Sequence, residues 1–482
     1  MKQSNSTIGP PAEPAEALVL ASSLGGWAER GHGALSRRLA HAIRASIESG
    51  LLADGSRFPP ERALASALAV SRSTLTSALD ELRADGLVES RQGSATTVRG
   101  PAARAVTGSR VGDHFSGWAG IDLAVGNPPD AAHLPPISLD VADLLAAGEG
   151  PGVQPLGLMS LRSALAEMYT ADGRLTDPEQ IHVTAGAHHA VSLLVRTLMG
   201  PDRCVAADDP SYPGLYDIIE AIGARTIAVA SDHVGLLPES LDRVLSEDRP
   251  GVVYVQTGPH NPTGRVAPVS RLRALADVLD RHGATVIEDC GLAELAFDGR
   301  PRPELADLCR RAVVVSVGSM SKVAWGGLRI GWFRAPAPTV DRSMYVRLGD
   351  DLGPSVPSQL LVLQLLPHLA EMGRLRRTSL RESVERSVAW IAAELPDWQL
   401  VAPSGGSVLW PELPITDTGP FVQLASRHGV RVAPGSVATA GRVADPHVRI
   451  CVDRQWDVVE TGLSRLALAW REWSTRGART LG

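Results

Sequence analysis

Lys322 is one of only two lysines among the 47 basic residues of this 482-residue chain, the other being Lys2. Arginine therefore serves wherever positive charge alone is needed. A lysine amine can lose its proton and condense with an aldehyde, whereas a guanidinium stays protonated and is a poor nucleophile. The segment SVGSMSKVAWGGLRIGW, residues 316–332, contains this lysine. We therefore consider a Schiff-base lysine at this position, and an ordinary surface lysine is the alternative.

Three other residues match what a pyridoxal phosphate site requires. Such a site needs an amine for the aldehyde, a carboxylate for the pyridine nitrogen, a ring for stacking and donors for the phosphate. Asp289 ends the apolar segment ATVIED and could keep the pyridine nitrogen protonated, unless it only caps a helix. Asn261 begins NPTG after VVYVQT and would place its amide beside the phenolic oxygen, unless NPTG is only a turn. Tyr212 in DDPSYPG suits ring stacking, with a core aromatic as the alternative.

Several residues are candidates for binding the phosphate. Arg329 follows the lysine by seven residues and could clamp a phosphate with two hydrogen bonds, with the hydroxyls of Ser319 and Ser321 nearby. Gly186 and Ala187 begin an expected helix, and N–H groups at a helix N-terminus bind anions. A solvated arginine and an ordinary helix start are the alternatives.

From residue 121 onward, short apolar segments alternate with helical patterns. The segments IHVTAG, CVAADDP, GVVYVQTG, ATVIEDC and AVVVSVGS predict strands, and residues 269–282 predict a helix between two of them. This alternation predicts an α/β fold with a mainly parallel sheet covered on both faces. Ligands bind at the carboxyl ends of such strands, where the candidate residues lie. The last hundred residues predict a further mixed α/β unit.

The first hundred residues show helical periodicity in three successive segments. Leucine and isoleucine recur at helical spacing in residues 35–47, 64–68 and 75–82. Pro60 suits the first turn of the second helix, and Ser71 suits the N-cap of the third. Two short β-prone segments follow, residues 87–89 and 95–98, with a turn between them. Helix, turn, helix and a two-stranded wing form a unit that reads DNA.

The start of the third helix carries residues suited to DNA contact. A recognition helix presents its first residues to base edges and phosphates, and here these are Ser71, Arg72, Ser73 and Thr74. Arginine can bind guanine with two hydrogen bonds, and Arg62 on the preceding helix is placed to meet the DNA backbone. A small helical domain without a DNA role is the alternative.

The composition indicates a folded protein and disfavours several classes. The chain is 44% hydrophobic with a net charge of −6, which is typical of a globular protein with two or three domains. Its four cysteines are widely spaced without a CxxC pair, so we expect no metal site, no disulfide framework and a cytoplasmic location. We also expect no membrane contact, because no apolar run approaches the roughly 18 residues of a membrane helix and no signal peptide is evident.

The sequence of the N-terminal unit resembles the GntR-type winged helix. The resemblance rests on FPPERALASALAVSRSTLTSALDELRADGLVESRQGSATTV, residues 58–98. Thr76 stands where some relatives have arginine, so the target sequence does not transfer. The resemblance implies contacts with double-stranded DNA through Arg62, Ser71, Arg72, Ser73 and Thr74, and through Gln92 and Gly93 at the wing tip.

The second region resembles the fold type I aminotransferases of the aspartate aminotransferase family. The resemblance rests on the ordered set Tyr212, Asn261, Asp289, Lys322 and Arg329, and it spans residues 121 to the C-terminus. It implies that the arginine of HVRICVD, Arg449, binds a substrate carboxylate.

One position departs from this pattern. Relatives have a tyrosine two or three residues beyond the aspartate, where its hydroxyl bonds the cofactor's phenolic oxygen, but this chain has Gly291 and Leu292. The neighbouring Cys290 is at best a weak substitute. Loss of the donor should leave the Schiff base more readily protonated, which disfavours efficient transamination.

A winged helix joined to an aminotransferase-like domain resembles the MocR-type transcriptional regulators. We expect an N-terminal tail at 1–30, a winged helix at 31–99, a linker at 100–118 and a pyridoxal 5′-phosphate-binding domain at 119–482. The resemblance implies the cofactor on Lys322, promoter DNA as a partner, and an amine, an amino acid or the cofactor itself as effector. It also implies a head-to-tail homodimer in which each winged helix packs against the partner's large domain.

Two other functions stay open at this point. One is a working aminotransferase with an appended DNA-binding domain, and the other is a cofactor-free regulator whose second domain only dimerises. The missing tyrosine disfavours the first. A purified protein that stays colourless with added pyridoxal phosphate would support the second.

Overall fold

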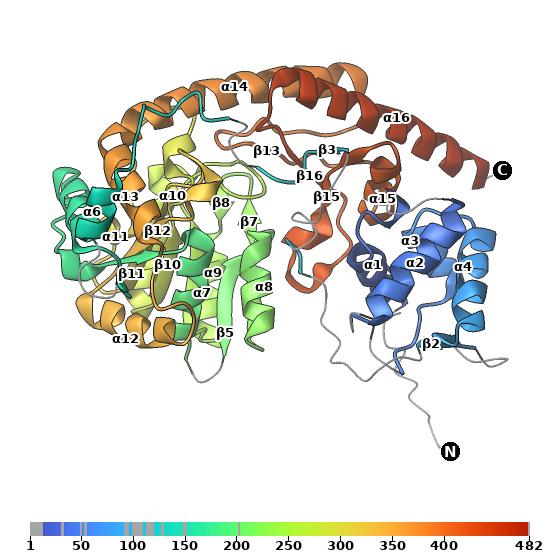
Figure 1. The fold of residues 1–482 in the computed structure, drawn as a ribbon, viewed down its shortest axis with the longest axis horizontal. Helices are drawn as coiled ribbons and strands as arrows, with labels where there is room; N and C mark the ends of the chain where they lie inside the picture. The colour runs from blue at the N-terminus through green and yellow to red at the C-terminus, as the bar shows by residue number, and fades with distance from the viewer. Residues whose placement is uncertain are drawn as a thin grey trace.

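The structure is a computed structural model that describes residues 13–29, 33–48, 51–52, 55–90, 96–98, 109–111, 120–126, 130–147, 152–200 and 203–480. It has an N-terminal helical unit, a large α/β domain and a smaller C-terminal domain (Figure 1). The N-terminal unit comprises α1 (Glu13–Ser23), α2 (Leu35–Glu48), α3 (Glu61–Ala67), α4 (Arg72–Ala84), β1 (Val88–Glu89) and β2 (Thr97–Val98).

Most strands and many helices belong to the large domain. Its strands are β4 (Ile181–Thr184), β5 (Cys204–Asp208), β6 (Arg225–Val229), β7 (Ser231–Asp232), β8 (Gly235–Leu236), β9 (Val252–Gln256), β10 (Thr285–Asp289), β11 (Val313–Ser319) and β12 (Gly331–Arg334). Its helices are α5 (Val141–Ala147), α6 (Met159–Ala171), α7 (Ala187–Leu198), α8 (Pro213–Ala221), α9 (Pro238–Glu247), α10 (Val269–His282), α11 (Leu305–Leu308), α12 (Ala337–Leu348) and α13 (Val356–Leu365). The smaller domain comprises β3 (Ile121–Asp122), α14 (Leu369–Glu394), β13 (Val408–Leu409), α15 (Gly419–Arg427), β14 (Val430–Arg431), β15 (Ala433–Pro434), β16 (Val448–Cys451) and α16 (Trp456–Thr480).

The N-terminal unit is a winged helix, as its sequence pattern predicts. Leu64, Leu75 and Leu79 are fully buried in its core, because the helical spacing places them on the inner faces of α3 and α4. The Ser71 hydroxyl caps α4 by accepting a hydrogen bond from the Thr74 amide at 3.0 Å. Strands β1 and β2 form the antiparallel wing.

The predicted N-terminal tail differs from the structure in its second half. Residues 1–12 lie outside the described residues, but α1 and the 3-10 helix Trp27–Glu29 are folded against the winged helix. The apolar side chains of Leu20, Leu24 and Trp27 are buried in its core, which accounts for the ordered helix. The prediction overlooked this short apolar stripe because polar, proline-rich sequence precedes it.

The large domain contains a seven-stranded sheet in the order β4-β12-β11-β10-β9-β5-β6. The pairs β10–β11, β9–β10, β5–β9 and β5–β6 are parallel, and β12 alone runs antiparallel to both of its neighbours. This confirms the predicted α/β fold with a mainly parallel sheet. The carboxyl ends of the six parallel strands therefore lie along one edge.

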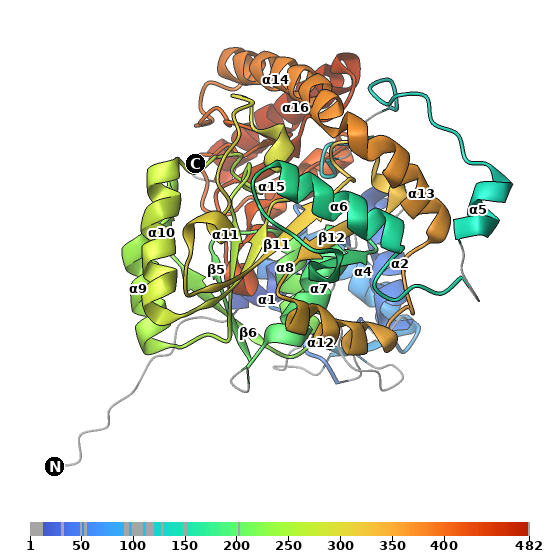
Figure 2. The same cartoon turned by 90° about the vertical axis from the view of Figure 1, so that its left-hand side faces the viewer.

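Helices cover both faces of this sheet (Figure 2). On one face, apolar side chains of α7, α8 and α12 pack against the strands, and on the other face those of α9 and α10 do so. Because successive strand residues point to opposite faces, Ile287 belongs to the first cluster and Val286 to the second. None of the helices in the described ranges combines the length and the apolar character needed to cross a bilayer.

The smaller domain lies between the large domain and the winged helix (Figure 1). Its core centres on Phe421, Trp398 and Trp470, whose rings meet edge to face. Helix α15 faces the winged helix, and the Gln423 amide donates a hydrogen bond to the Ala21 carbonyl at 3.4 Å. The winged helix is thus docked on the smaller domain.

Candidate functional site

The candidate residues of the large domain converge at the carboxyl edge of its sheet. Asp289 ends β10, Ser319 ends β11, and Ala187 begins the helix that follows β4. All three residues surround Gly291. A Cβ atom at this position would lie 3.0 Å from the Asp289 Oδ1, 3.6 Å from the Ser319 Cβ and 3.8 Å from the Ala187 Cβ. Residues more than 100 positions apart in sequence therefore share one small site.

Lys322 lies in the turn after β11, three residues beyond Ser319. The Nζ atom donates a hydrogen bond to the Gly126 carbonyl. Burial lowers the pKa of Lys322 to about 8; Cys451 opposes this shift, and the charge of Arg449 adds to it. At this pKa roughly a tenth of the amine is unprotonated at pH 7, against less than about a thousandth for an ordinary lysine, and the unprotonated amine is the state that attacks an aldehyde.

Asp289 is held by two internal donors. The Tyr254 hydroxyl donates to its Oδ2 at 2.7 Å, and the Gly291 amide donates to its Oδ1 at 2.9 Å. Burial raises the pKa of Asp289, and these two hydrogen bonds oppose that shift. Tyr254 was not among the predicted site residues, although a polar hydroxyl within the apolar segment VVYVQ is a usable signal.

A positively charged corner lies at the other side of the site. Gly186 is the N-cap of α7 with a φ of 93°, and the Arg329 Nη2 donates to the Ala185 carbonyl at 2.9 Å. A Cβ on Gly186 would lie 3.0 Å from the Arg329 Nη2, so glycine permits this close approach. The Ser321 amide donates to the Ser319 hydroxyl at 3.2 Å, which places both serines in the same turn. The helix N-terminus and the guanidinium together suit an anion.

Tyr212 lies directly before α8, as the N-cap residue of that helix. Its hydroxyl is 3.2 Å from the Nδ1 of His188, and the two rings meet edge to face at 6.2 Å. Burial, and after it the negative charge of Asp289, raises the pKa of Tyr212 to about 12. Burial and the positive charge of Arg329 lower the pKa of His188. Both groups are therefore neutral at physiological pH. His188 is a neighbour that the sequence analysis did not name.

Arg449 and Asn261 are in direct contact. The Arg449 Nε donates to the Asn261 Oδ1 at 3.0 Å, and its Nη1 donates to the Ala124 carbonyl at 2.6 Å. Gln256 fixes the Asn261 backbone by exchanging hydrogen bonds with its N–H and C=O at 3.0 and 3.2 Å. Because its oxygen faces Arg449, the Asn261 amide nitrogen is the donor that remains for a ligand.

A buried ionic cluster joins the loop after β5 to the loop after β9. Asp208 lies 2.6 Å from the His260 Nε2 and 2.9 Å from the Arg265 Nη2, and it accepts a hydrogen bond from the Ser211 hydroxyl at 3.1 Å. Burial alone would raise the pKa of Asp208, but His260 and Arg265 hold it below its usual value. Sequence analysis missed this cluster, which fixes two site-forming loops relative to each other.

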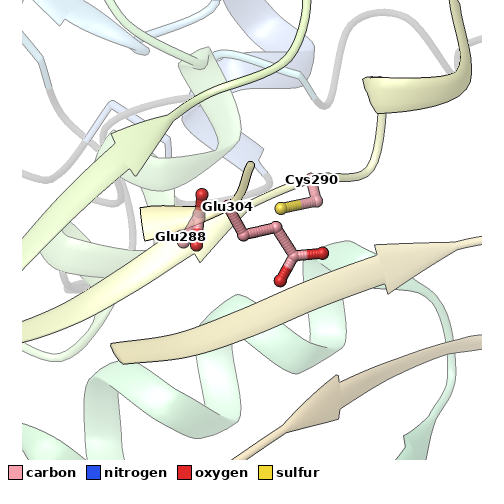
Figure 3. A group of neighbouring side chains, drawn as sticks. All are labelled: Glu288, Cys290 and Glu304. Atoms are coloured by element: carbon pink, nitrogen blue, oxygen red, sulfur yellow. The ribbon is translucent and has the colours of Figure 1, made fainter. Parts of the chain in front are cut away.

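The position of the missing tyrosine offers no hydroxyl. The Gly291 amide is bonded to Asp289, and Leu292 packs against an apolar cluster. Cys290 was expected to be at best a weak substitute, and its thiol lies beside Glu288 and Glu304 (Figure 3), on the face of the sheet opposite to that of Asp289. Its Sγ lies 3.7 Å from the Thr257 hydroxyl, and burial raises the thiol pKa well above its usual value.

Glu288, one of the two glutamates of this cluster, retains its proton at neutral pH. Glu288 accepts hydrogen bonds from the Thr257 hydroxyl at 2.8 Å and the Leu305 amide at 2.7 Å, while Glu304 accepts one from the Ser316 hydroxyl at 2.7 Å. Burial and the nearby Glu304 raise the pKa of Glu288 to about 8. The pair is therefore a hydrogen-bonded structural unit behind the site.

The predicted DNA-contacting residues lie on the surface of the winged helix. Arg62, Ser71, Arg72 and Ser73 are exposed, and Thr74 is half-buried. The Ser71 hydroxyl lies 2.8 Å from the Ser73 hydroxyl and 2.7 Å from the Thr74 hydroxyl, so it orders the start of α4 as well as capping it. The wing-tip residues Gln92 and Gly93 lie outside the described residues. The individual roles of all these residues stay predictions.

Comparison with known proteins agrees with this architecture. The family described as "Aminotransferase class I and II" matches residues 119–466, and the family described as "Bacterial regulatory proteins, gntR family" matches residues 35–98. The structure resembles LysN, an α-aminoadipate aminotransferase from Thermus thermophilus complexed with N-(5′-phosphopyridoxyl)-L-leucine. The TM-score is 0.65 at 25% identity, covering 73% of this chain and 92% of LysN.

Two regulators are similar in sequence. The HTH-type transcriptional regulator TauR of Rhodobacter capsulatus is 28% identical over 88% of this chain and 92% of its own length. The HTH-type pyridoxine biosynthesis transcriptional regulator PdxR of Corynebacterium glutamicum is 31% identical over 62% of this chain and 66% of its own length.

The fold and site thus define a GntR-type DNA-binding unit fused to an aminotransferase-like domain. The chain belongs to the aminotransferase class I and II family, and its fusion of that domain to a GntR-type winged helix is the architecture of the MocR-type transcriptional regulators.

Replacing Glu288 with glutamine should flatten the dependence of stability on pH. The folded state keeps the Glu288 proton up to about pH 8, whereas an unfolded glutamate loses it near its ordinary pKa of 4.5. The wild-type free energy of unfolding should therefore fall as pH rises from about 5 to 8. Over this range Glu288→Gln should lose less free energy of unfolding than the wild type does, as measured by denaturant unfolding at several pH values. Glu382→Gln, at an exposed site, is the control, and parallel pH profiles for all three proteins would refute the retained proton.

Replacing Tyr254 with phenylalanine should destabilise the fold by about 1–2 kcal/mol at neutral pH, because the buried Asp289 carboxylate loses a donor. The loss should be smaller at acidic pH, where a protonated Asp289 no longer needs that donor. Denaturant unfolding at the two pH values measures the difference. Tyr345→Phe is the control, since that ring is 71% exposed. An equal loss at both pH values would indicate a packing defect instead.

Proposed function

We propose that this chain is a cytoplasmic, dimeric regulator that binds promoter DNA and holds pyridoxal 5′-phosphate on Lys322. Its effector would be an amine, an amino acid or the cofactor itself. The observation that carries the proposal is an amine of pKa about 8 at the sheet edge where Asp289 and Arg329 also lie. The winged helix at the other end of the chain supplies the DNA contact.

The donor set of the site fits pyridoxal 5′-phosphate, whose aldehyde condenses with amines. In this proposal Lys322 provides the attacking Nζ, and Asp289, already fixed by Tyr254, holds the proton of the pyridine nitrogen. The Asn261 amide nitrogen donates to the phenolic oxygen, because Arg449 occupies the amide oxygen.

The phosphate and the ring would be bound by the remaining residues. Arg329 and the N–H groups of Gly186 and Ala187 bind the phosphate, with Ser319 beside them. The neutral ring of Tyr212 stacks on the pyridine ring, while its hydroxyl is held by His188.

An effector with a carboxylate would be recognised by Arg449. This guanidinium is fixed by Asn261 and by the Ala124 carbonyl, so a carboxylate meets a preoriented cation beside the amine of Lys322. An amino acid would satisfy both groups at once. The similarity to PdxR, named for pyridoxine biosynthesis, supports the cofactor as an alternative effector.

A dimer would present two winged helices to two half-sites of DNA. Relatives of this architecture pair head to tail, and two-fold symmetry in the protein matches a palindromic operator. The effector would alter DNA binding only by preferring one arrangement of the two winged helices.

A working aminotransferase is the competing function, and the similarity to LysN favours it. Against it, neither Gly291 nor Leu292 supplies the hydroxyl that the related enzymes carry. Repeated conversion of amino acids to 2-oxo acids by the purified holoprotein would favour the enzyme. Binding without turnover would favour the regulator.

Two variants separate cofactor attachment from DNA contact. DNA duplexes would be enriched from a random pool by the wild-type protein, and their affinity measured by fluorescence anisotropy with and without pyridoxal 5′-phosphate. The cofactor should change wild-type affinity about fivefold or more. Lys322→Ala should lose this response but bind DNA, whereas Arg72→Ala should weaken DNA binding roughly tenfold or more and still bind cofactor. A full response in Lys322→Ala would overturn the proposal.

The rate of cofactor attachment should depend on the pKa of Lys322. The amine attacks only when it is unprotonated, so the rate should rise with pH and level off above about pH 8. An ordinary lysine would give a rate that climbs beyond about pH 10. Stopped-flow absorbance between about pH 6.5 and 10 with excess cofactor measures this profile, and a continued climb would contradict the lowered pKa.

A further inference from the structure

Three residues of the predicted linker are ordered against the large domain. Ser109, Arg110 and Val111 lie on α8, between undescribed residues on both sides. The Asp217 carboxylate accepts hydrogen bonds from the Ser109 hydroxyl at 2.7 Å, the Arg110 amide at 2.8 Å and the Val111 amide at 3.2 Å. One carboxylate therefore binds three consecutive linker residues.

The Arg110 side chain is only 3% exposed and fills a pocket, here called the arginine socket, formed by Tyr216, Glu220 and the carbonyls of Val437 and Thr439. Its Nη2 donates to the Glu220 carboxylate at 2.6 Å, and its Nη1 donates to the carbonyls of Val437 at 3.0 Å and Thr439 at 2.6 Å. The guanidinium carbon lies 4.4 Å from the centroid of the Tyr216 ring. This socket suits an arginine better than a lysine, because a planar guanidinium can bond the Glu220 carboxylate and both carbonyls while it stacks on the Tyr216 ring.

The socket spans the two domains that form the candidate cofactor site. Glu220 and Tyr216 belong to α8, which begins directly after Tyr212. The Val437 and Thr439 carbonyls lie in and just after the 3-10 helix 435–438, which follows β15. Strand β15 pairs with β16 at the position of Arg449.

Two further contacts tie the socket to the site loops. The Ser211 amide donates to the Ala438 carbonyl at 2.8 Å, and the Ala440 amide donates to Asp209 at 3.1 Å. Any change in spacing between the loop carrying Tyr212 and the segment after β15 would therefore distort the arginine socket.

From these contacts, we propose that the socket is the docking site of the interdomain linker and that Arg110 couples the winged helix to the cofactor-site loops. The occupant is a segment of this chain, residues 109–111. The docking follows from the contacts alone, whereas the coupling rests on the proposed function.

The docking is tested on the full-length protein without cofactor. Arg110→Ala should raise hydrogen exchange about fivefold or more in peptides covering 109–111 and α8, and should speed proteolysis within residues 100–118. Arg110→Lys should be intermediate, because an ammonium cannot reach Glu220 and both carbonyls as a planar fork does. Arg243→Ala, on the exposed side of α9, is the matched control. Wild-type exchange and proteolysis rates in Arg110→Ala would overturn the docking.

The coupling is tested by the ratio of DNA affinities with and without pyridoxal 5′-phosphate. In Arg110→Ala this ratio should approach one, while cofactor affinity and cofactor-free DNA affinity stay within about twofold of wild type. A wild-type ratio retained in Arg110→Ala would overturn the coupling and leave the proposed function intact. If the DNA affinity of the wild type does not change with the cofactor alone or with the cofactor plus a panel of amines and amino acids, the proposed function and the coupling both fail, and the exchange data alone decide the docking.

Discussion

The desolvation of one amine is the constraint on which the site depends. Lys322 lies just after β11, where the carboxyl ends of parallel strands meet, and its Nζ donates a hydrogen bond to the Gly126 carbonyl, next to the Cys451 side chain of β16. In water a lysine is almost fully protonated at neutral pH; here burial, reinforced by the charges of Arg449 and Arg329, brings the pKa of Lys322 down to about 8. The sheet therefore positions the nucleophile, while Arg449 and Cys451 of the smaller domain contribute to its electrostatic environment.

The same edge of the sheet is held together by polar contacts that link separate loops. Asp208 joins the loops after β5 and β9 through His260 and Arg265, and Asn261 joins the second of these loops to Arg449. Arg110 adds the interdomain linker to this set. A ligand that moves one loop must move the others, because buried ionic contacts are costly to break singly.

Much of the fold could be predicted because periodic patterns report local structure. The helix 269–282, the Ser71 cap and the strand ending at Asp289 follow from spacing and turn chemistry, and the structure places them as expected. Contacts between distant segments left no such pattern. From the sequence Tyr254 is an ordinary core aromatic, and only the structure shows its hydroxyl bonded to Asp289. Arg110 is one of many arginines and lies in a stretch with the composition of a linker, although its side chain is buried in the structure. The apolar stripe of residues 13–29 was too short to stand out.

Borohydride reduction of the protein with pyridoxal 5′-phosphate, followed by peptide mass mapping, tests the central claim most directly. The account predicts a single phosphopyridoxyl group on the peptide that contains Lys322. Labelling only at Lys2 or at the N-terminal amine, or no labelling at saturating cofactor, would contradict it.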